Sequence, residues 1–236
     1  MDVSDIISDA LTYPFNNIKA LILFMILGIL GGIAGGGSLV GVLAGQASNN
    51  TVAAGGFGIV GLIILIIIGL LIEGYQLDIV KFGIERRNDA PGLDFVRQII
   101  NAIKLAIVGI VYYLIPAIII AILGIFFKDW ILVILILVFG IIFGFAEFMA
   151  KCRLAKTESL GHALAVGEAI GDISRVGIIN LLLTIVLIFL IMFIAFFICG
   201  FIINWNSIVG GIIFGIVLVY TTFFANRATG LLYSNV

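Results

Sequence analysis

Charged side chains are scarce in this sequence: only 11% of its 236 residues are Asp, Glu, Lys or Arg, while 63% are hydrophobic. Soluble domains carry about 25% charged residues, so this composition excludes an ordinary soluble domain. Charge is absent altogether from four blocks, residues 20–72, 105–127, 131–146 and 176–226. A helix needs about 20 apolar residues to cross a bilayer, and the blocks are long enough for one or two such helices each. The composition therefore indicates an integral membrane protein.

Histidine and cysteine are also rare, with one His and two Cys in the whole chain. A zinc-binding helix needs two His one turn apart, so His162 alone excludes that type of site. Cys152 and Cys199 are expected near opposite sides of the membrane, where they stay free and pack as small apolar groups. The glycine-rich run GGIAGGGSLVG lacks the Lys of a phosphate-binding loop. We therefore expect no catalytic residues, no metal and no cofactor, and hence a protein that is not an enzyme.

The charge-free blocks divide at polar or Gly-rich interruptions into six predicted spans. Backbone N–H and C=O groups in hydrocarbon must bond within their own segment, so each span is expected to be a helix. The predicted spans cover residues 20–42, 56–77, 105–127, 130–150, 177–203 and 208–225. The sequence thus predicts an all-α polytopic membrane protein with six transmembrane helices as three hairpins. We expect one integral membrane domain over residues 1–236.

Lysine and arginine gather on one side of this predicted topology. The chain has 12 basic residues, and all except Lys128 lie before the first span, after the last, or in the loops after spans two and four. Basic loops stay in the cytoplasm, so we expect a protein of the cell membrane with both termini cytoplasmic. The pattern Asn49-Asn50-Thr51 then falls in an outer loop, where an N-x-T glycosylation acceptor is usable.

Three stretches that precede the odd-numbered spans have the period of amphipathic helices. In residues 166–176, apolar side chains recur on one stripe, and Glu168, Asp172 and Arg175 fall on the opposite, polar face. Residues 3–14 and 95–103 follow the same period. We expect three cytoplasmic interfacial helices, one before each hairpin. They either form a true threefold repeat or resemble one another because any cytoplasmic lead-in helix has this pattern.

Glycine spacing predicts where the spans approach one another. Four pairs have the GxxxG spacing that lets helices pack closely: Gly28 and Gly32, Gly31 and Gly35, Gly140 and Gly144, and Gly211 and Gly215. Such spacings are also frequent by chance in a chain with 29 glycines.

A polar crevice at the cytoplasmic side is the candidate site. The side chains that could line it are Asn180, Thr184, Asn226, Glu73 and Glu147. The Asn and Thr side chains could equally form hydrogen bonds that hold helices together. Acids inside a membrane are candidates for proton or ion relays, but both lie near the cytoplasmic end, and we favour interfacial anchoring. His162 is expected to be an exposed interfacial side chain.

Three motifs outside the spans resemble a known family. They are MDVSDIISDALTYPFNNIK (residues 1–19), EGYQLDIVKFGIERRNDAPGLDF (73–95) and KTESLGHALAVGEAIGDISRVG (156–177). Together they resemble the archaeal membrane-protein family catalogued as domain of unknown function 4013. Ala90 departs from the family pattern, which usually has an acidic residue immediately before this proline. The resemblance implies membrane location and architecture and supplies no catalytic residues. The layout is similar, more distantly, to the membrane portion of some glycerophosphodiester phosphodiesterases, which implies lipid-related work.

Two functions are compatible with this sequence. The first is a non-enzymatic module that assembles with membrane lipids, with copies of itself or with other membrane proteins. The second is a transporter or channel for a small or amphiphilic solute, built on the crevice and a kink at Pro116. No ionisable group lies at the predicted midplane of any span, which argues against a proton-coupled pump. Neither function calls for a nucleic-acid partner, and we expect none.

Overall fold

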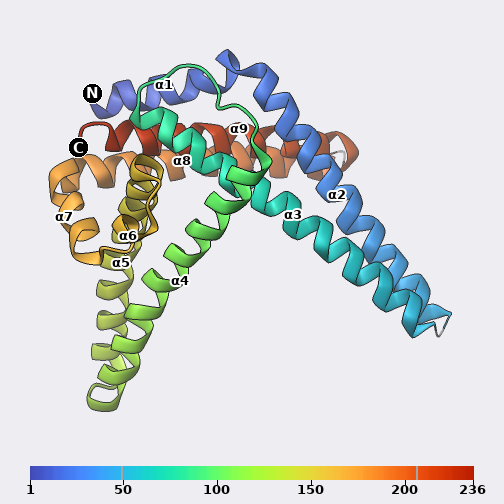
Figure 1. The fold of residues 1–236 in the computed structure, drawn as a ribbon, viewed down its shortest axis with the longest axis horizontal. Coiled ribbons are helices and arrows are strands. Elements are labelled where there is room, and N and C mark those ends of the chain that lie inside the picture. The colour runs from blue at the N-terminus through green and yellow to red at the C-terminus, as the bar shows by residue number, and fades with distance from the viewer. Residues whose placement is uncertain (49, 206) are drawn as a thin grey trace.

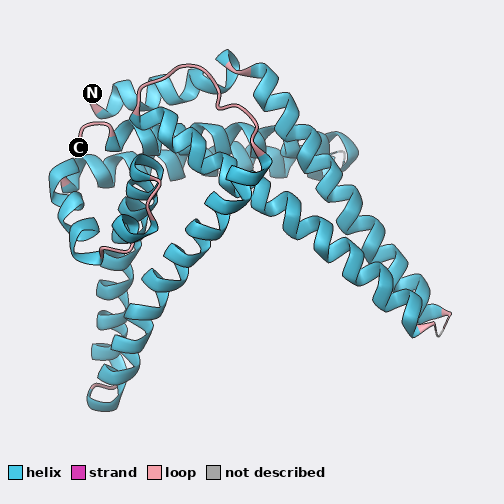
Figure 2. Cartoon of the chain, viewed as in Figure 1, coloured by secondary structure: helices cyan, strands magenta, loops and turns pink. Residues whose placement is uncertain are grey.

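A computed structural model, which describes residues 1–48, 50–205 and 207–236, folds into helices joined by short connections (Figures 1 and 2). The described residues contain no strand. The helices are α1 (Val3–Asn16), α2 (Ile18–Ala47), α3 (Thr51–Ile84), α4 (Phe95–Phe126), α5 (Asp129–Thr157), α6 (Leu160–Ala163), α7 (Val166–Val176), α8 (Ile178–Trp205) and α9 (Ser207–Tyr233). The all-α prediction is confirmed. Asn49, the predicted glycosylation acceptor, lies outside the described residues.

Several helices are long and apolar enough to cross a membrane. Within the described part of the chain, these are residues 55–84 of α3 and the whole of α4, α5 and α8. A fifth candidate is α1 with residues 18–31 of α2, a pair that bends by 75°. The protein is therefore a polytopic membrane protein, and the count of six spans stays a prediction.

The long helices pack as three antiparallel pairs that diverge from a common end. The pairs are α2 with α3, α4 with α5, and α8 with α9. In Figure 1 the α2–α3 pair and the α4–α5 pair point away from each other, while α1, α6 and α7 gather where the pairs meet. We call this meeting region the base and define it as residues 3–16, 71–104, 143–176 and 221–233.

Most of the buried core lies in the base. Its larger cluster contains Ile6 and Ala10 of α1, Leu77 and Val80 of α3, and neighbouring parts of α4 to α9. A second cluster joins Tyr13, Phe24, Tyr75, Ile79 and Phe223. At the far ends of the hairpins, by contrast, Trp130 is 68% exposed and Trp205 is 88% exposed. The chain thus packs on itself at one end and presents apolar side chains to lipid at the other.

The stretches expected as interfacial helices have two different outcomes. Residues 3–16 and 166–176 form the separate helices α1 and α7, which end at Asn17 and at Gly177 with its φ of +91°. Residues 95–103 are not a separate helix but the first turns of α4. The prediction of a third lead-in helix is therefore wrong, because nothing between Asn101 and the span breaks the helix.

The close helix crossings use glycines outside the GxxxG pairs. A Cβ atom on Gly83 of α3 would lie 2.9 Å from the Cα of Gly230 on α9. A Cβ on Gly230 would overlap the carbonyl oxygen of Val80, and one on Gly74 would overlap the backbone of Gln98 in α4.

The prediction that helices approach closely at the GxxxG pairs is wrong for four of these glycines. A Cβ atom added at Gly28, Gly140, Gly144 or Gly215 would meet nothing within 4 Å. At Gly31 it would make an ordinary contact of 3.4 Å with Ile68. The contacts of Gly32, Gly35 and Gly211 are not among those that the structure describes.

The crossing of α3 and α9 gives the first prediction. Gly230→Ala should lower the free energy of unfolding by about 1–3 kcal/mol, since no space exists for a methyl group against Val80. Gly109→Ala is the matched control, because a Cβ at Gly109 meets nothing within 4 Å. The measurement is the thermal midpoint in detergent, followed with a thiol-reactive dye that reports exposure of the buried Cys152 and Cys199. Equal midpoints for the two variants would contradict the crossing.

Candidate functional site

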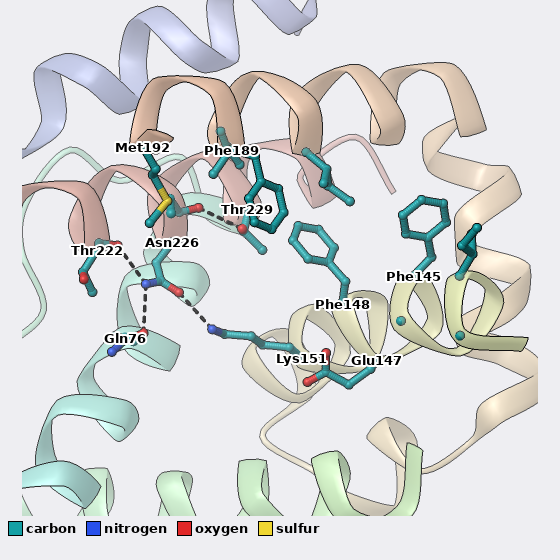
Figure 3. Close-up of a pocket in the computed structure, with 16 residues that line it drawn as sticks. Gln76, Phe145, Glu147, Phe148, Lys151, Phe189, Met192, Thr222, Asn226 and Thr229 are labelled. Carbon is teal, nitrogen blue, oxygen red and sulfur yellow. Dashed lines mark hydrogen bonds between the residues drawn. The ribbon is translucent and has the colours of Figure 1, made fainter. Parts of the chain in front are cut away.

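A pocket of about 530 Å³ lies beside the base, between α5, α8 and α9, with one residue from α3. This volume falls in the range of about 300–1,000 Å³ that is usual for small-molecule sites. Most of its wall is apolar and comes from Phe145, Phe148, Ile188, Phe189 and Met192 (Figure 3). The pocket therefore has the chemistry to hold a hydrocarbon chain.

One end of the pocket is polar and is organised around Asn226 of α9 (Figure 3). The Asn226 amide nitrogen donates to Gln76 Oε1 at 3.1 Å and to the carbonyl oxygen of Thr222 at 2.8 Å. These bonds orient the amide so that its oxygen accepts from Lys151 Nζ at 3.0 Å. Three helices, α3, α5 and α9, thus contribute to one hydrogen-bonded chain.

The structure brings together only some of the residues predicted for a crevice. Asn226 and Glu147 both line the pocket. Thr184 is buried but does not line it, and its hydroxyl forms no hydrogen bond with the described residues. Asn180 is exposed and donates to the Val176 carbonyl oxygen at 3.5 Å, and Glu73 is exposed on α3.

Sequence reasoning missed Gln76 and Lys151 as parts of the site. On sequence alone, Lys151 is only a neighbour of Glu147, one turn away on the same predicted helix. The available signal was that Gln76, Glu147, Lys151 and Asn226 all lie near helix ends on one side of the topology. Pairing them across three helices required the tertiary structure.

A buried ion-pair network fixes the base end of α5. Asp172 of α7 is fully buried and accepts from Arg153 Nη1 at 2.9 Å and from the Tyr233 hydroxyl at 2.6 Å. Arg153 also donates from Nε to the His162 carbonyl oxygen at 2.9 Å and pairs with Glu168. The prediction that Asp172 lies on the polar face opposite the apolar stripe is therefore wrong: Asp172 is buried with Ala169 and Ile173, and Arg153 and Tyr233 compensate its burial.

The same network sets the pKa of Asp172. Burial raises the pKa of this carboxyl, but hydrogen bonds from Tyr233 and Arg153, with the charges of Arg153 and Arg175, outweigh burial and hold it below its ordinary value. Arg175 adds a hydrogen bond of 2.9 Å to the other carboxylate oxygen. The carboxylate is therefore the favoured form and contributes to stability.

A second buried charge fixes the end of α9. Arg227 is 1% exposed and donates to Asp9 Oδ1 at 2.8 Å and to Asn88 Oδ1 at 3.0 Å. It also donates to the Arg87 carbonyl oxygen and lies 4.7 Å from the Tyr13 ring centre. These contacts tie α9 to α1 and to the connection between α3 and α4. Arg227 therefore anchors α9 at the position immediately after Asn226.

The side chain of His162 has no part in these sites. Its side chain is exposed, as predicted, and only its carbonyl oxygen takes part in the Arg153 network. Among the residues that the structure describes, no three His, Cys, Asp or Glu side chains lie together as metal ligands would. Cys152 and Cys199 are free and buried, which confirms that prediction.

Comparison with known proteins gives a match to a family. The model of the family described as protein of unknown function, DUF4013, matches residues 57–204. This range is more than half of the 236 residues and extends from α3 to α8, so it includes most of the pocket. No curated protein and no solved structure matches the chain.

The lowered pKa of Asp172 gives the second prediction. A carboxyl whose pKa is lowered by folding adds stability above its unfolded value of about 3.9 and loses it as the pH falls through the folded value. Asp172→Asn should cost about 3 kcal/mol at pH 7, because it leaves Arg153 without its buried partner. It should also flatten the loss of stability below pH 4.

The control for this prediction is Asp5→Asn, which changes an exposed acid of α1. Its thermal midpoint should follow that of the unchanged protein from pH 7 to pH 3. An Asp172→Asn protein as stable as the control at pH 7 would show that the buried pair does not hold α7.

Proposed function

The chain belongs to the DUF4013 family, and from that premise we propose that it is a non-enzymatic membrane module that binds a lipid or another amphiphile in the pocket between α5, α8 and α9. The observation that carries the proposal is the pocket's division into a long apolar wall and one polar end. An amphiphile has the same division, so each part of the molecule finds a matching surface.

The dimensions of the pocket support this proposal. Along α5 its lining extends from Gly140 to Lys151, which at about 1.5 Å per residue is about 16 Å. That length is about half of the 30 Å hydrocarbon thickness of a bilayer. It suits an acyl or isoprenoid chain of one leaflet better than a small polar solute.

The polar end supports binding rather than chemistry. Its hydrogen-bonded chain consists of the amides of Gln76 and Asn226 and the ammonium of Lys151. Amides are neither acids nor bases near neutral pH but donate and accept hydrogen bonds, so they suit recognition of a headgroup. Partners of the module would be lipids and, at the exposed hairpin ends, copies of the chain or other membrane proteins.

A transporter of the same amphiphile is the second candidate function, since one pocket with a polar end could serve either purpose. Flux across proteoliposomes separates the two. Binding without flux supports the module. Flux that Asn226→Leu abolishes would favour the transporter.

Occupancy of the pocket gives the third prediction. Gly144→Leu should place side-chain atoms in the pocket, because Gly144 lines it and a Cβ there meets nothing within 4 Å. Native mass spectrometry of gently solubilised protein should show a retained amphiphile that this variant loses at least tenfold. Gly109→Leu changes a similarly open glycine outside the pocket and should retain it. An empty unchanged protein, or equal retention by Gly144→Leu, would refute the proposal.

The orientation of the base gives the fourth prediction. We propose that the base is cytoplasmic, because every Lys and Arg except Lys128 lies at that end of its helix or in a connection there. A Cys at Ser48, which is exposed between α2 and α3, should react with an impermeant thiol reagent on intact cells. A Cys at Glu85, exposed at the base, should react only after permeabilisation. The reverse pattern would invert the topology.

A further inference from the structure

The polar end of the pocket holds one basic and one acidic side chain, and the two do not form an ion pair with each other. Lys151 and Glu147 line the pocket and lie one turn apart on α5. Within residues 1–48, 50–205 and 207–236, Lys151 forms no ion pair, and its ammonium has one hydrogen bond, to Asn226. In the same part of the chain, Glu147 has neither an ion pair nor a hydrogen bond.

This situation differs from that of the ionised groups nearby in the base. Arg97 pairs with the buried Asp78, Arg153 with Asp172, and Arg227 with Asp9. Ionised groups removed from water are costly unless they are paired and hydrogen-bonded, and these pairs follow that rule. Lys151 and Glu147 are the ionisable side chains that line the pocket. Neither takes part in an ion pair with a described residue, so both can bind a charged group of an occupant.

Lys151 is held in a position to bind an anion. An ammonium has three N–H donors, and the bond to Asn226 uses one of them. Because Gln76 and Thr222 fix the Asn226 amide, they also fix the place of the ammonium (Figure 3). The remaining two donors can bind two oxygens of a phosphate. Glu147, with two free carboxylate oxygens, can accept from an ammonium at the same end.

Resting on the proposed function, we propose that the pocket selects amphiphiles whose headgroup is zwitterionic, with a phosphate that binds Lys151 and an ammonium that binds Glu147. A purely anionic headgroup would satisfy Lys151 and place its charge close to Glu147. An uncharged headgroup would satisfy neither side chain. Only a headgroup with both charges pairs both without a change in the net charge of the site.

The fifth prediction concerns this selectivity. Native mass spectrometry would follow binding from an equal mixture of dioctanoyl phosphatidylethanolamine, dioctanoyl phosphatidylglycerol and dioctanoylglycerol. The unchanged protein should prefer the zwitterionic lipid to the uncharged one by more than about tenfold, because one charge-assisted contact accounts for about tenfold and this lipid makes two. Its preference over the anionic lipid should be smaller, since that lipid still binds Lys151.

Three variants, two at Lys151 and one at Glu147, separate the two contacts. Lys151→Gln should reduce binding of phosphatidylglycerol to the level of dioctanoylglycerol or below. It should lower binding of phosphatidylethanolamine less, because that lipid keeps its contact with Glu147, and Lys151→Arg should keep the phosphate preference. Glu147→Gln should remove the preference for phosphatidylethanolamine over phosphatidylglycerol and leave dioctanoylglycerol binding unchanged. Thermal midpoints near that of the unchanged protein would exclude a loss of fold as the cause.

The outcomes distinguish this inference from the proposed function. Equal binding of the three lipids, lost in Gly144→Leu, would overturn the headgroup selectivity and keep the amphiphile pocket. A preference that neither Lys151→Gln nor Glu147→Gln changes would also overturn it. No binding of any of the three lipids would count against the proposed function itself.

Discussion

Burial of opposite charges at one end of the molecule is the constraint on which the rest of the structure depends. Lipid tails are as apolar as the side chains of the spans, so there is little hydrophobic gain when two spans pack together. In the base, by contrast, Asp172 and Arg227 are almost completely removed from solvent, and each has partners on two other segments. Removing either ion from its partners would cost several kcal/mol, which fixes α5, α7 and α9 relative to one another.

The polar end of the pocket follows from the same anchors. On α5, Arg153 reaches α7, and Lys151 lies two residues earlier, about 200° around the helix. On α9, Arg227 reaches α1 and the neighbouring Asn226 faces α5 and α3. Lys151 and Asn226 meet in the pocket. They are positioned by Arg153 and Arg227, which hold the same two helices in the base. Beyond the base the hairpins diverge, and their surfaces are left to lipid (Figure 1).

The sequence was sufficient for features that depend on local chemistry. Long charge-free blocks predicted the helices, and the predicted boundaries between residues 127 and 130 and between 203 and 208 agree with the beginnings of α5 and α9. Periodicity failed at Asp172, because it registers the helix face of a side chain and not the distant Arg153 that compensates its burial. It also divided residues 95–126 into two helices, although of the three lead-in stretches only the two that end at Asn17 and Gly177 are separated from the long helix that follows. Of the candidate site, it found Asn226 and Glu147 but could not pair them with Gln76 and Lys151.

The start of α4 indicates which medium surrounds the base. Its polar side chains Gln98 and Asn101 are buried, whereas Phe95 is 55% exposed and Val96 is 70% exposed. A helix whose exposed side faced water would reverse this arrangement, so the exposed side of Phe95 and Val96 suits an apolar medium. Phe189, which lines the pocket, is likewise 70% exposed. An amphiphile that reaches the pocket would therefore enter sideways from the bilayer and keep its chain in an apolar medium throughout, while its headgroup moves along the interface to Lys151.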